Sequence, residues 1–255
     1  MDLRDQITVV IPTSPIPSHP STAIIDETIL TVRRHLPDSP ILIQADGIRP
    51  EQESLRGAYT QYLGHLANRN TYKTELHIFE TFQHQASMMK KTIDQIKTPL
   101  MLYLEHDTPL CEDKEIDWNG MIEIVRSGTL HSIRLHHYNL GWIHPEHDYL
   151  MLDRERLYYE PIHLPVIRTV QWSQRAHLTT VEFYKKVLSY FSDESRTMIE
   201  DHFYNVIMQD VNWRGKQAVW DAWRLAIYAP EGHIKRSRDL NGRDGGPKFE
   251  DTFRA

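Results

Sequence analysis

The stretch LMLYLEHDTPL, residues 100–110, contains the pattern from which the fold can be worked out. Its first five residues, Leu100–Leu104, form an apolar run typical of a buried β-strand. Glu105 and Asp107 follow and flank His106. Side chains two residues apart on a strand point to one side, so both carboxylates can face one ligand. Two carboxylates with an imidazole suit Mn²⁺ or Mg²⁺; acids that cap a turn at a solvated strand end are the alternative.

Strand and helix patterns alternate upstream of this stretch. Strands are predicted over Ile7–Pro12, Ile41–Ala45 and Leu76–Glu80, and helices over about Thr22–His35, Pro50–Ala67 and Gln85–Ile96. This order predicts an α/β fold, Rossmann-like, with a mostly parallel central sheet covered by helices on both faces. Ligands of such sheets bind beyond the carboxyl ends of the strands, where Asp46 and the Glu105–Asp107 motif lie.

The second half of the chain is less regular. Strands are predicted over His131–His136 and Leu225–Ala229, and helices after a capping box at Thr179–Glu182 and within Ser195–Met208. Gly and charged residues dominate from Pro230 onward, so this tail is expected to be a loop that a ligand would order.

The composition is that of an ordinary soluble protein. The chain has 255 residues, 40 % of them hydrophobic and 25 % charged, with a net charge of -6. A strongly basic field that would hold nucleic acid is therefore absent from the composition. The single Cys111 excludes an intramolecular disulfide framework and a zinc site built on several cysteines. The apolar stretch near the N-terminus is too short for a signal peptide or membrane span, so we expect a cytoplasmic protein with no integral membrane segment.

Two further acidic motifs could carry chemistry. Asp46-Gly47 could accept a hydrogen bond from a base N–H or a ribose hydroxyl, or could form an ordinary turn. Glu200-Asp201 lies in a predicted helix, where adjacent side chains cannot both face one point. One acid could be a general base, or the pair could belong to a charged helix face.

The tail carries a basic cluster. Lys235, Arg236 and Arg238 follow His233 in a segment rich in Gly and charge. Arg binds phosphate oxygens in a bidentate manner and Lys adds a point charge, so the cluster suits a phosphate-bearing ligand. A basic solubilising tail is the alternative.

Aromatic side chains between these motifs mark a possible acceptor region. Trp142 and Trp172 could stack on a sugar or a base, and Arg175 could meet a phosphate or carboxylate. Two Trp residues that fill the core are the alternative. A separate metal site on the His-rich loop is also conceivable, although its spacing fits no zinc template; its members would be His136, His137, His144 and His147.

Taken in order, these motifs resemble the family 2-like glycosyltransferases of the GT-A fold. ITVVIPTSP at residues 7–15 resembles their first strand, and ILIQADG at residues 41–47 their second. Residues 83–109 resemble the helix and strand that lead to the DXD motif. The resemblance is spread over most of residues 5–245.

The resemblance implies metal-binding residues. Glu105-His106-Asp107 would be a degenerate DXD motif, with Glu in the first place and His in the centre. Asp107 would bind the Mn²⁺ or Mg²⁺ ion that bridges the donor diphosphate. Glu105 would contact the ribose or the metal's water, and His233 would match the C-terminal metal ligand of some GT-A enzymes.

The resemblance also implies donor-binding residues. The nucleobase pocket would be lined by Pro12, Thr13 and Asp46. The diphosphate would be clamped by Lys235, Arg236 and Arg238, and an arginine that the family often carries would be replaced by Lys90 or Lys91.

The implied reaction is sugar transfer from a nucleoside-diphosphate donor, a UDP-sugar being favoured, to an acceptor hydroxyl. In the pair Glu200-Asp201 the second acid, Asp201, would be the base, giving inversion at the anomeric carbon; without a correctly placed base the transfer would instead proceed with retention. A single domain over residues 1–255 would comprise a nucleotide-sugar half (about 1–110), an irregular acceptor half (about 111–229) and a basic tail (230–255) that closes over the donor.

Two other functions stay open. A nucleotidyltransferase would normally open with a Gly-rich phosphate loop, and Ile11–Pro15 has no Gly. A catalytically inactive module that binds a nucleotide sugar or glycan would be favoured by the Glu-for-Asp change at Glu105. The acceptor is also open and includes a glycan, a small molecule or a modified nucleic acid.

Overall fold

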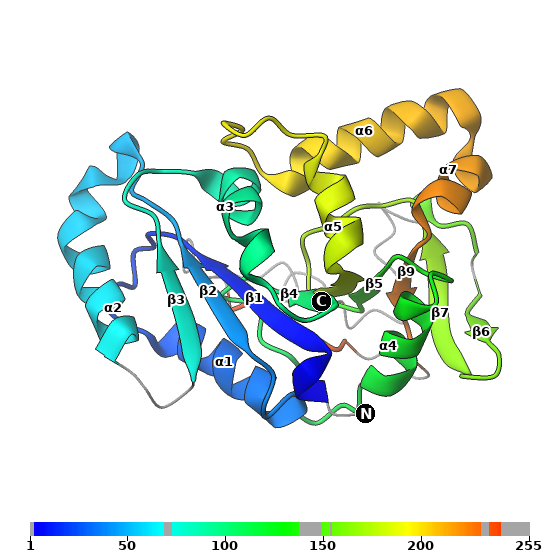
Figure 1. The fold of residues 1–255 in the computed structure, drawn as a ribbon, viewed down its shortest axis with the longest axis horizontal. Helices are drawn as coiled ribbons and strands as arrows, with labels where there is room; N and C mark the ends of the chain where they lie inside the picture. The colour runs from blue at the N-terminus through cyan, green and yellow to red at the C-terminus, as the bar shows by residue number, and fades with distance from the viewer. Residues whose placement is uncertain (1–2, 69–72, 138–148, 154, 231–234, 241–255) are drawn as a thin grey trace, which may run out of the picture.

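The chain forms a twisted nine-stranded sheet with helices packed against it, shown in Figure 1. The computed structural model describes residues 3–68, 73–137, 149–153, 155–230 and 235–240. Within these residues the strand order is β3-β2-β1-β4-β8-β5-β9-β7-β6. The strands are β1 (Ile7–Thr13), β2 (Ile41–Ala45), β3 (Thr74–Ile78), β4 (Leu100–Tyr103), β5 (Ser132–Leu135), β6 (Leu157–Tyr159), β7 (Leu164–Thr169), β8 (His177–Thr180) and β9 (Leu225–Tyr228).

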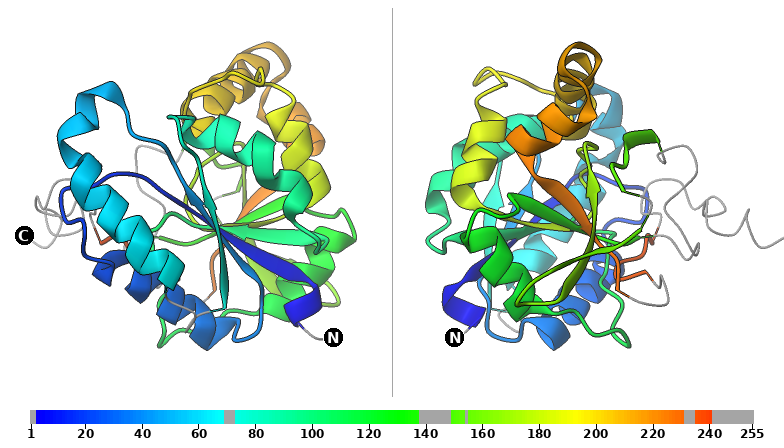
Figure 2. Two further views of the ribbon diagram at one scale, coloured as in Figure 1. Left: turned by 60° about the vertical axis from the view of Figure 1, so that its left-hand side comes forward. Right: turned by 90° about the vertical axis from the view of Figure 1, so that its right-hand side faces the viewer.

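Helices cover both faces of this sheet, as predicted (Figure 2). The helices are α1 (Ala23–His35), α2 (Arg56–Asn68), α3 (His84–Thr92), α4 (Trp118–Arg126), α5 (Val181–Leu188), α6 (Ile199–Arg214) and α7 (Lys216–Trp223). Apolar side chains of α1, α2 and α4 share one core cluster with the sheet, and those of α3, α5, α6 and α7 share the other. Short 3-10 helices span Leu3–Asp5, Pro50–Leu55 and Ile93–Gln95.

β1 lies at the centre of the parallel half of the sheet. All seven of its residues are buried, because strands covered on both faces have no solvated side. Its side chains alternate between faces: Val9 packs with α1, and Val10 packs with α3. It pairs in parallel with β2 and with β4, where Val9 lies opposite Ile41 and Leu102 respectively.

The second half makes the sheet mixed rather than mostly parallel, which corrects the prediction. β8 is antiparallel to both β4 and β5, β7 is antiparallel to β9, and β6 is antiparallel to β7. The parallel pairs are β1–β2, β1–β4, β2–β3 and β5–β9. The α/β class and the parallel arrangement of the first four strands are confirmed.

α5 begins at an N-cap one residue later than the predicted capping box. The hydroxyl oxygen of Thr180 accepts a hydrogen bond from the Phe183 N–H at 3.0 Å. Thr179 is instead buried in β8, where its hydroxyl donates to the His131 carbonyl. The N-cap is therefore Thr180, the last residue of β8, and not Thr179.

Because β1, β2 and β4 are parallel, their carboxyl ends meet at one edge of the sheet. Thr13 ends β1, Asp46 follows β2, and Glu105 lies two residues beyond β4. These three predicted site residues therefore gather at this edge. In the part of the chain that the structure describes, no helix is long and apolar enough to cross a membrane.

Candidate active site

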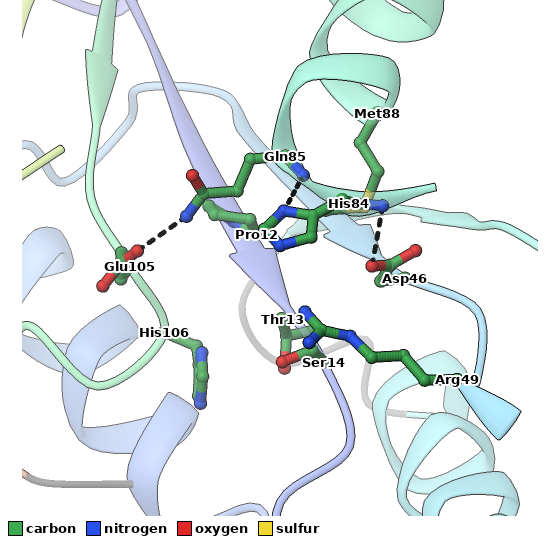
Figure 3. A pocket seen from close by; sticks show the side chains of 10 residues that line it. All are labelled: Pro12, Thr13, Ser14, Asp46, Arg49, His84, Gln85, Met88, Glu105 and His106. Carbon is green, nitrogen blue, oxygen red and sulfur yellow. Dashed lines mark hydrogen bonds between the residues drawn. The ribbon is translucent and has the colours of Figure 1, made fainter. Parts of the chain in front are cut away.

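Two adjoining cavities open at this edge, and Glu105 lines both. The first cavity is shown in Figure 3 and is lined by Pro12, Thr13, Ser14, Asp46, Arg49, His84, Gln85, Met88, Glu105 and His106. The second cavity is lined by Glu105, Asp107, Thr108, Gln174, Arg175, Met198, Glu200 and Asp239. Predicted donor, metal, base and acceptor residues therefore line two neighbouring cavities that meet at Glu105.

The Asp46 carboxylate holds the start of α3. One oxygen accepts from the N–H groups of Gly47 and Gln83 at 2.8 and 2.7 Å, and the other accepts from the His84 N–H at 3.0 Å. Gln83 is in the right-handed region and His84, at φ 63°, in the left-handed region, which directs successive N–H groups at one anion. Burial raises the pKa of Asp46, and these three bonds oppose that rise.

Arg49 is a lining residue that sequence reasoning missed. Its guanidinium lies 4.6 Å from the centre of the Phe82 ring, in a cation–π contact. In Figure 3 the guanidinium points toward Thr13 and Ser14. A single Arg in a loop belongs to no periodic pattern of the sequence. Only its position three residues after Asp46 could have indicated that Arg49 lines the site.

The three residues of the acidic motif face different surroundings. Glu105 accepts a hydrogen bond from the Gln85 side-chain amide at 2.8 Å. His106 lines the first cavity, and its carbonyl accepts from the Thr28 hydroxyl of α1 at 2.7 Å. Asp107 lines the second cavity with Glu105, although not through the strand alternation on which the prediction rested. The motif is a turn after β4 rather than an extension of the strand.

Of the acidic pair on α6, the first residue enters the second cavity. Glu200 accepts from the Gln174 N–H at 2.8 Å and from the Ser173 hydroxyl at 3.4 Å. Asp201 is exposed and lies outside the lining of both cavities. A step of one residue turns a helical side chain by about 100°, so only one of the two acids can face the cavity. This reverses the order that the resemblance implied.

Trp172 belongs to the core, which corrects its prediction as an acceptor-stacking residue. It is 2 % exposed and meets the Phe203 ring edge-on at 5.2 Å. His177 lies beside it, stacked on Tyr103 and Tyr184. Burial lowers the pKa of His177 to about 4 and raises that of Tyr103. Arg175, by contrast, lines the second cavity, and its role toward an acceptor stays a prediction.

Lys90 does not face the donor site. Its ammonium donates to the Phe191 carbonyl at 2.6 Å and to the Asp193 carboxylate at 2.7 Å. The first cavity takes Gln85 and Met88 from the same helix. Lys91 is one position further round α3 and donates to the side chain of Gln83. The predicted replacement for the family's arginine is therefore wrong for both lysines.

The described part of the basic tail is arranged differently from the prediction. Residues 236–240 run antiparallel to residues 107–111, with Arg238 N–H bonded to the Pro109 carbonyl and Leu240 N–H to that of Asp107. Alternate side chains of such a segment face opposite ways. Asp239 consequently lines the second cavity, which sequence reasoning did not foresee.

The arginines of this segment are engaged elsewhere. Arg236 is buried and donates to the Glu115 carbonyl at 3.0 Å, and Arg238 pairs with Glu27 of α1. Within the described part of the chain, the lining of both cavities excludes these two arginines and Lys235. The predicted diphosphate clamp is therefore not formed by these side chains in this structure.

Two predicted residues, Trp142 and His233, lie outside the described residues, as do His144 and His147. His137 is buried beside Ser237, and burial lowers its pKa well below the ordinary value. Over the described ranges, no group of three or more His, Cys, Asp or Glu side chains is arranged to hold a metal ion. The prediction of a His-rich metal site therefore gains no support there.

No protein-family model and no curated protein sequence matches the chain. Solved structures do match. GalNAc-T7 with UDP, GalNAc and Mn²⁺ has a TM-score of 0.52 at 12 % identity, covering 95 % of this chain and 45 % of that one. TarS 1-349 of S. aureus in complex with UDP-GlcNAc has a TM-score of 0.51 at 9 % identity, covering 97 % and 61 %.

A longer form of S. aureus TarS matches with a TM-score of 0.50 at 9 % identity, over 92 % of this chain and 36 % of that one. The chain thus spans less than two thirds of the length of each of these proteins. Similarity at such low identity establishes the path of the backbone. Together with the acidic turn at the carboxyl edge of its parallel strands, it shows that this chain has the GT-A fold of glycosyltransferases.

Proposed function

We propose that the chain is a glycosyltransferase that moves a sugar from a UDP-sugar to an acceptor hydroxyl. One observation carries the proposal: Glu105 lines both cavities. A donor whose nucleotide lies against Thr13 and Arg49 would therefore extend toward Glu200 in the second cavity. The substrate would bind in one space and react in the next.

The choice of uracil as the base is supported by two observations. The matching proteins GalNAc-T7 and TarS were crystallised with UDP and with UDP-GlcNAc respectively. In the first cavity, Arg49 offers N–H donors, whereas Asp46 accepts from three backbone groups. A base edge with carbonyl oxygens matches such a donor.

The residues at the second cavity fit a divalent cation. Glu105 and Asp107 present carboxylate oxygens, which Mg²⁺ and Mn²⁺ prefer. Mg²⁺ is commonly bound through one or two carboxylates plus substrate phosphates, so two acids suffice for an ion that arrives with the diphosphate. Asp107 and Glu105 would hold it, and His233 stays a predicted third ligand. The ion would supply positive charge to the leaving diphosphate.

Glu200 is the general base of the proposed reaction. Its carboxylate takes the proton of the acceptor hydroxyl while the hydroxyl oxygen bonds to the anomeric carbon. The bond from that carbon to the UDP oxygen breaks, and its electron pair leaves with UDP. Attack opposite the leaving group inverts the anomeric centre. The Gln174 N–H orients the carboxylate, and Arg175 meets the acceptor, whose class we leave as a glycan, a small molecule or a modified nucleic acid.

A thermal-shift panel of UDP, GDP, CDP and dTDP, each with Mn²⁺ and with EDTA, tests this proposal. A ligand that binds only the folded state raises the melting temperature. We expect UDP to stabilise the protein with Mn²⁺ and not with EDTA. Asp107→Ala should abolish the shift, and Asp113→Ala, an exposed acid away from both cavities, should keep it.

Two outcomes would contradict the proposal. Absence of a shift with every nucleotide would remove the donor site altogether. A shift with UDP but no release of UDP from any UDP-sugar in a donor panel would leave the inactive binding module as the better description.

A further inference from the structure

We infer that Gln85 is a positioning residue that couples the donor-binding acid Glu105 to the helix that carries the general base Glu200. This inference rests on the proposed function. Gln85 is 8 % exposed and lies in the first turn of α3, where it lines the first cavity (Figure 3). It lies in the helix that the family resemblance covers, but the resemblance implied no role for it.

The two ends of the Gln85 carboxamide bind different elements. Its N–H group donates to the Glu105 carboxylate at 2.8 Å. Its oxygen accepts from the Ile199 N–H at 3.4 Å. Ile199 is the first residue of α6 and directly precedes Glu200. One side chain therefore joins the turn after β4 to the start of α6.

The backbone around Gln85 fixes its position. Asp46 binds the N–H groups of Gln83 and His84, which ties the start of α3 to β2. The Ala86 N–H donates to the Thr197 carbonyl at 3.3 Å, which ties the same turn to the segment before α6. With its backbone held on both sides, the Gln85 amide can dictate where its two partners lie.

The amide carries the donor that one partner needs and the acceptor that the other needs. The Glu105 carboxylate needs a donor, and the Ile199 N–H, an N-terminal helix group without an intrahelical acceptor, needs an acceptor. A hydrogen bond to a charged group is worth more than one between neutral groups. Loss of the amide would remove one hydrogen bond from Glu105 and one from the start of α6 at the same time, so donor binding and base placement would change in one step.

Isothermal titration with UDP and Mn²⁺ tests the Glu105 half of this link. We expect Gln85→Met to weaken UDP binding about tenfold, equivalent to about 1.4 kcal/mol. Gln85→Glu should weaken it further, because it sets a second carboxylate against Glu105. If Gln85 only filled space, Glu, which has the shape of Gln, would be tolerated better than Met. That order, or unchanged binding by both variants, would overturn the inference.

Two controls accompany the titration. Gln95→Met alters an exposed glutamine just beyond α3 and should bind UDP as the wild type does. The double variant Gln85→Met/Glu105→Gln should bind UDP no more weakly than whichever single variant binds it less well. The reason is that losses of binding free energy are not additive for residues in one hydrogen-bond network. Losses that multiply would show that Gln85 does not act through Glu105.

Hydrogen exchange of the Ile199 amide tests the α6 half without any ligand. In Gln85→Met the amide loses its acceptor and should exchange about tenfold faster, a change equivalent to about 1.4 kcal/mol of local opening. An unchanged rate would overturn the link to α6. A wild-type protein that binds no nucleoside diphosphate would overturn the proposed function, whereas wild-type binding with unaltered binding by Gln85→Met would overturn the role of Gln85 alone.

Discussion

Replacing Glu200 with Gln separates its proposed chemistry from its structural role. The carboxamide keeps the size of the side chain and an oxygen that can accept from the Gln174 N–H, now 2.8 Å from the carboxylate. It cannot take a proton at neutral pH. General base catalysis contributes about 10²–10⁴-fold, so kcat should fall by about that factor, or roughly 3–5 kcal/mol in activation free energy. UDP affinity should change less than about twofold, because Glu200 lies in the second cavity.

The assay is release of UDP from the UDP-sugar that is hydrolysed fastest in a donor panel, with Mn²⁺ and saturating donor. Asp201→Asn is the matched control, since it alters the neighbouring acid, which is exposed. Its kcat should stay within about twofold of the wild-type value. A large loss in Asp201→Asn with an active Glu200→Gln would refute the geometric argument and restore the base that the family resemblance implied.

Three further results are expected. In calorimetry, Arg49→Met should weaken the binding of UDP about tenfold and the binding of CDP much less. Arg56→Met, which alters an exposed ion pair, should change neither affinity. Gly47→Ala should lower the free energy of unfolding by about 2 kcal/mol in urea titrations, because its Cβ would overlap the backbone of Thr81. The pKa of His177 is about 4 in the folded protein and 6.5 in the unfolded chain. The free energy of unfolding should therefore fall as pH drops below 6.5, by roughly 2 kcal/mol at pH 5. In His177→Phe the slope of the unfolding free energy against pH should be smaller by about one proton. An equal loss for UDP and CDP, an unchanged unfolding midpoint, or an unchanged slope would contradict the respective argument.

The parallel half of the fold could be predicted because its signals are local. β2 begins and ends where the ILIQA run does, and α1 follows the apolar spacing of Ile25, Ile29 and Val32. A four-strand alternation then forces the carboxyl ends together. The placement of Asp46 and Glu105 at one edge followed from topology, without knowledge of any contact.

The antiparallel half depends on contacts between distant segments. β8 reads His-Leu-Thr-Thr, which has no apolar run, yet it is a strand because it pairs with β4 on one side and β5 on the other. β7 was not predicted either, and it contains Pro165, a residue that is uncommon inside a strand. Propensity is a weak guide to strands of this kind, since their stability comes from the neighbours that the fold supplies.

The direction of charged side chains was the least predictable feature, and it bears on the chemistry. The pairing of residues 236–240 with residues 107–111 turns Arg236 and Arg238 away and Asp239 inward. Among the described residues, the second cavity then has four carboxylates and one guanidinium, that of Arg175. A diphosphate approaching Glu105 and Asp107 would be repelled unless a cation accompanied it. Because Arg236 and Arg238 do not line this cavity, a metal ion has to offset the negative charge there. We therefore expect that EDTA, which removes the metal ion, abolishes nucleotide binding.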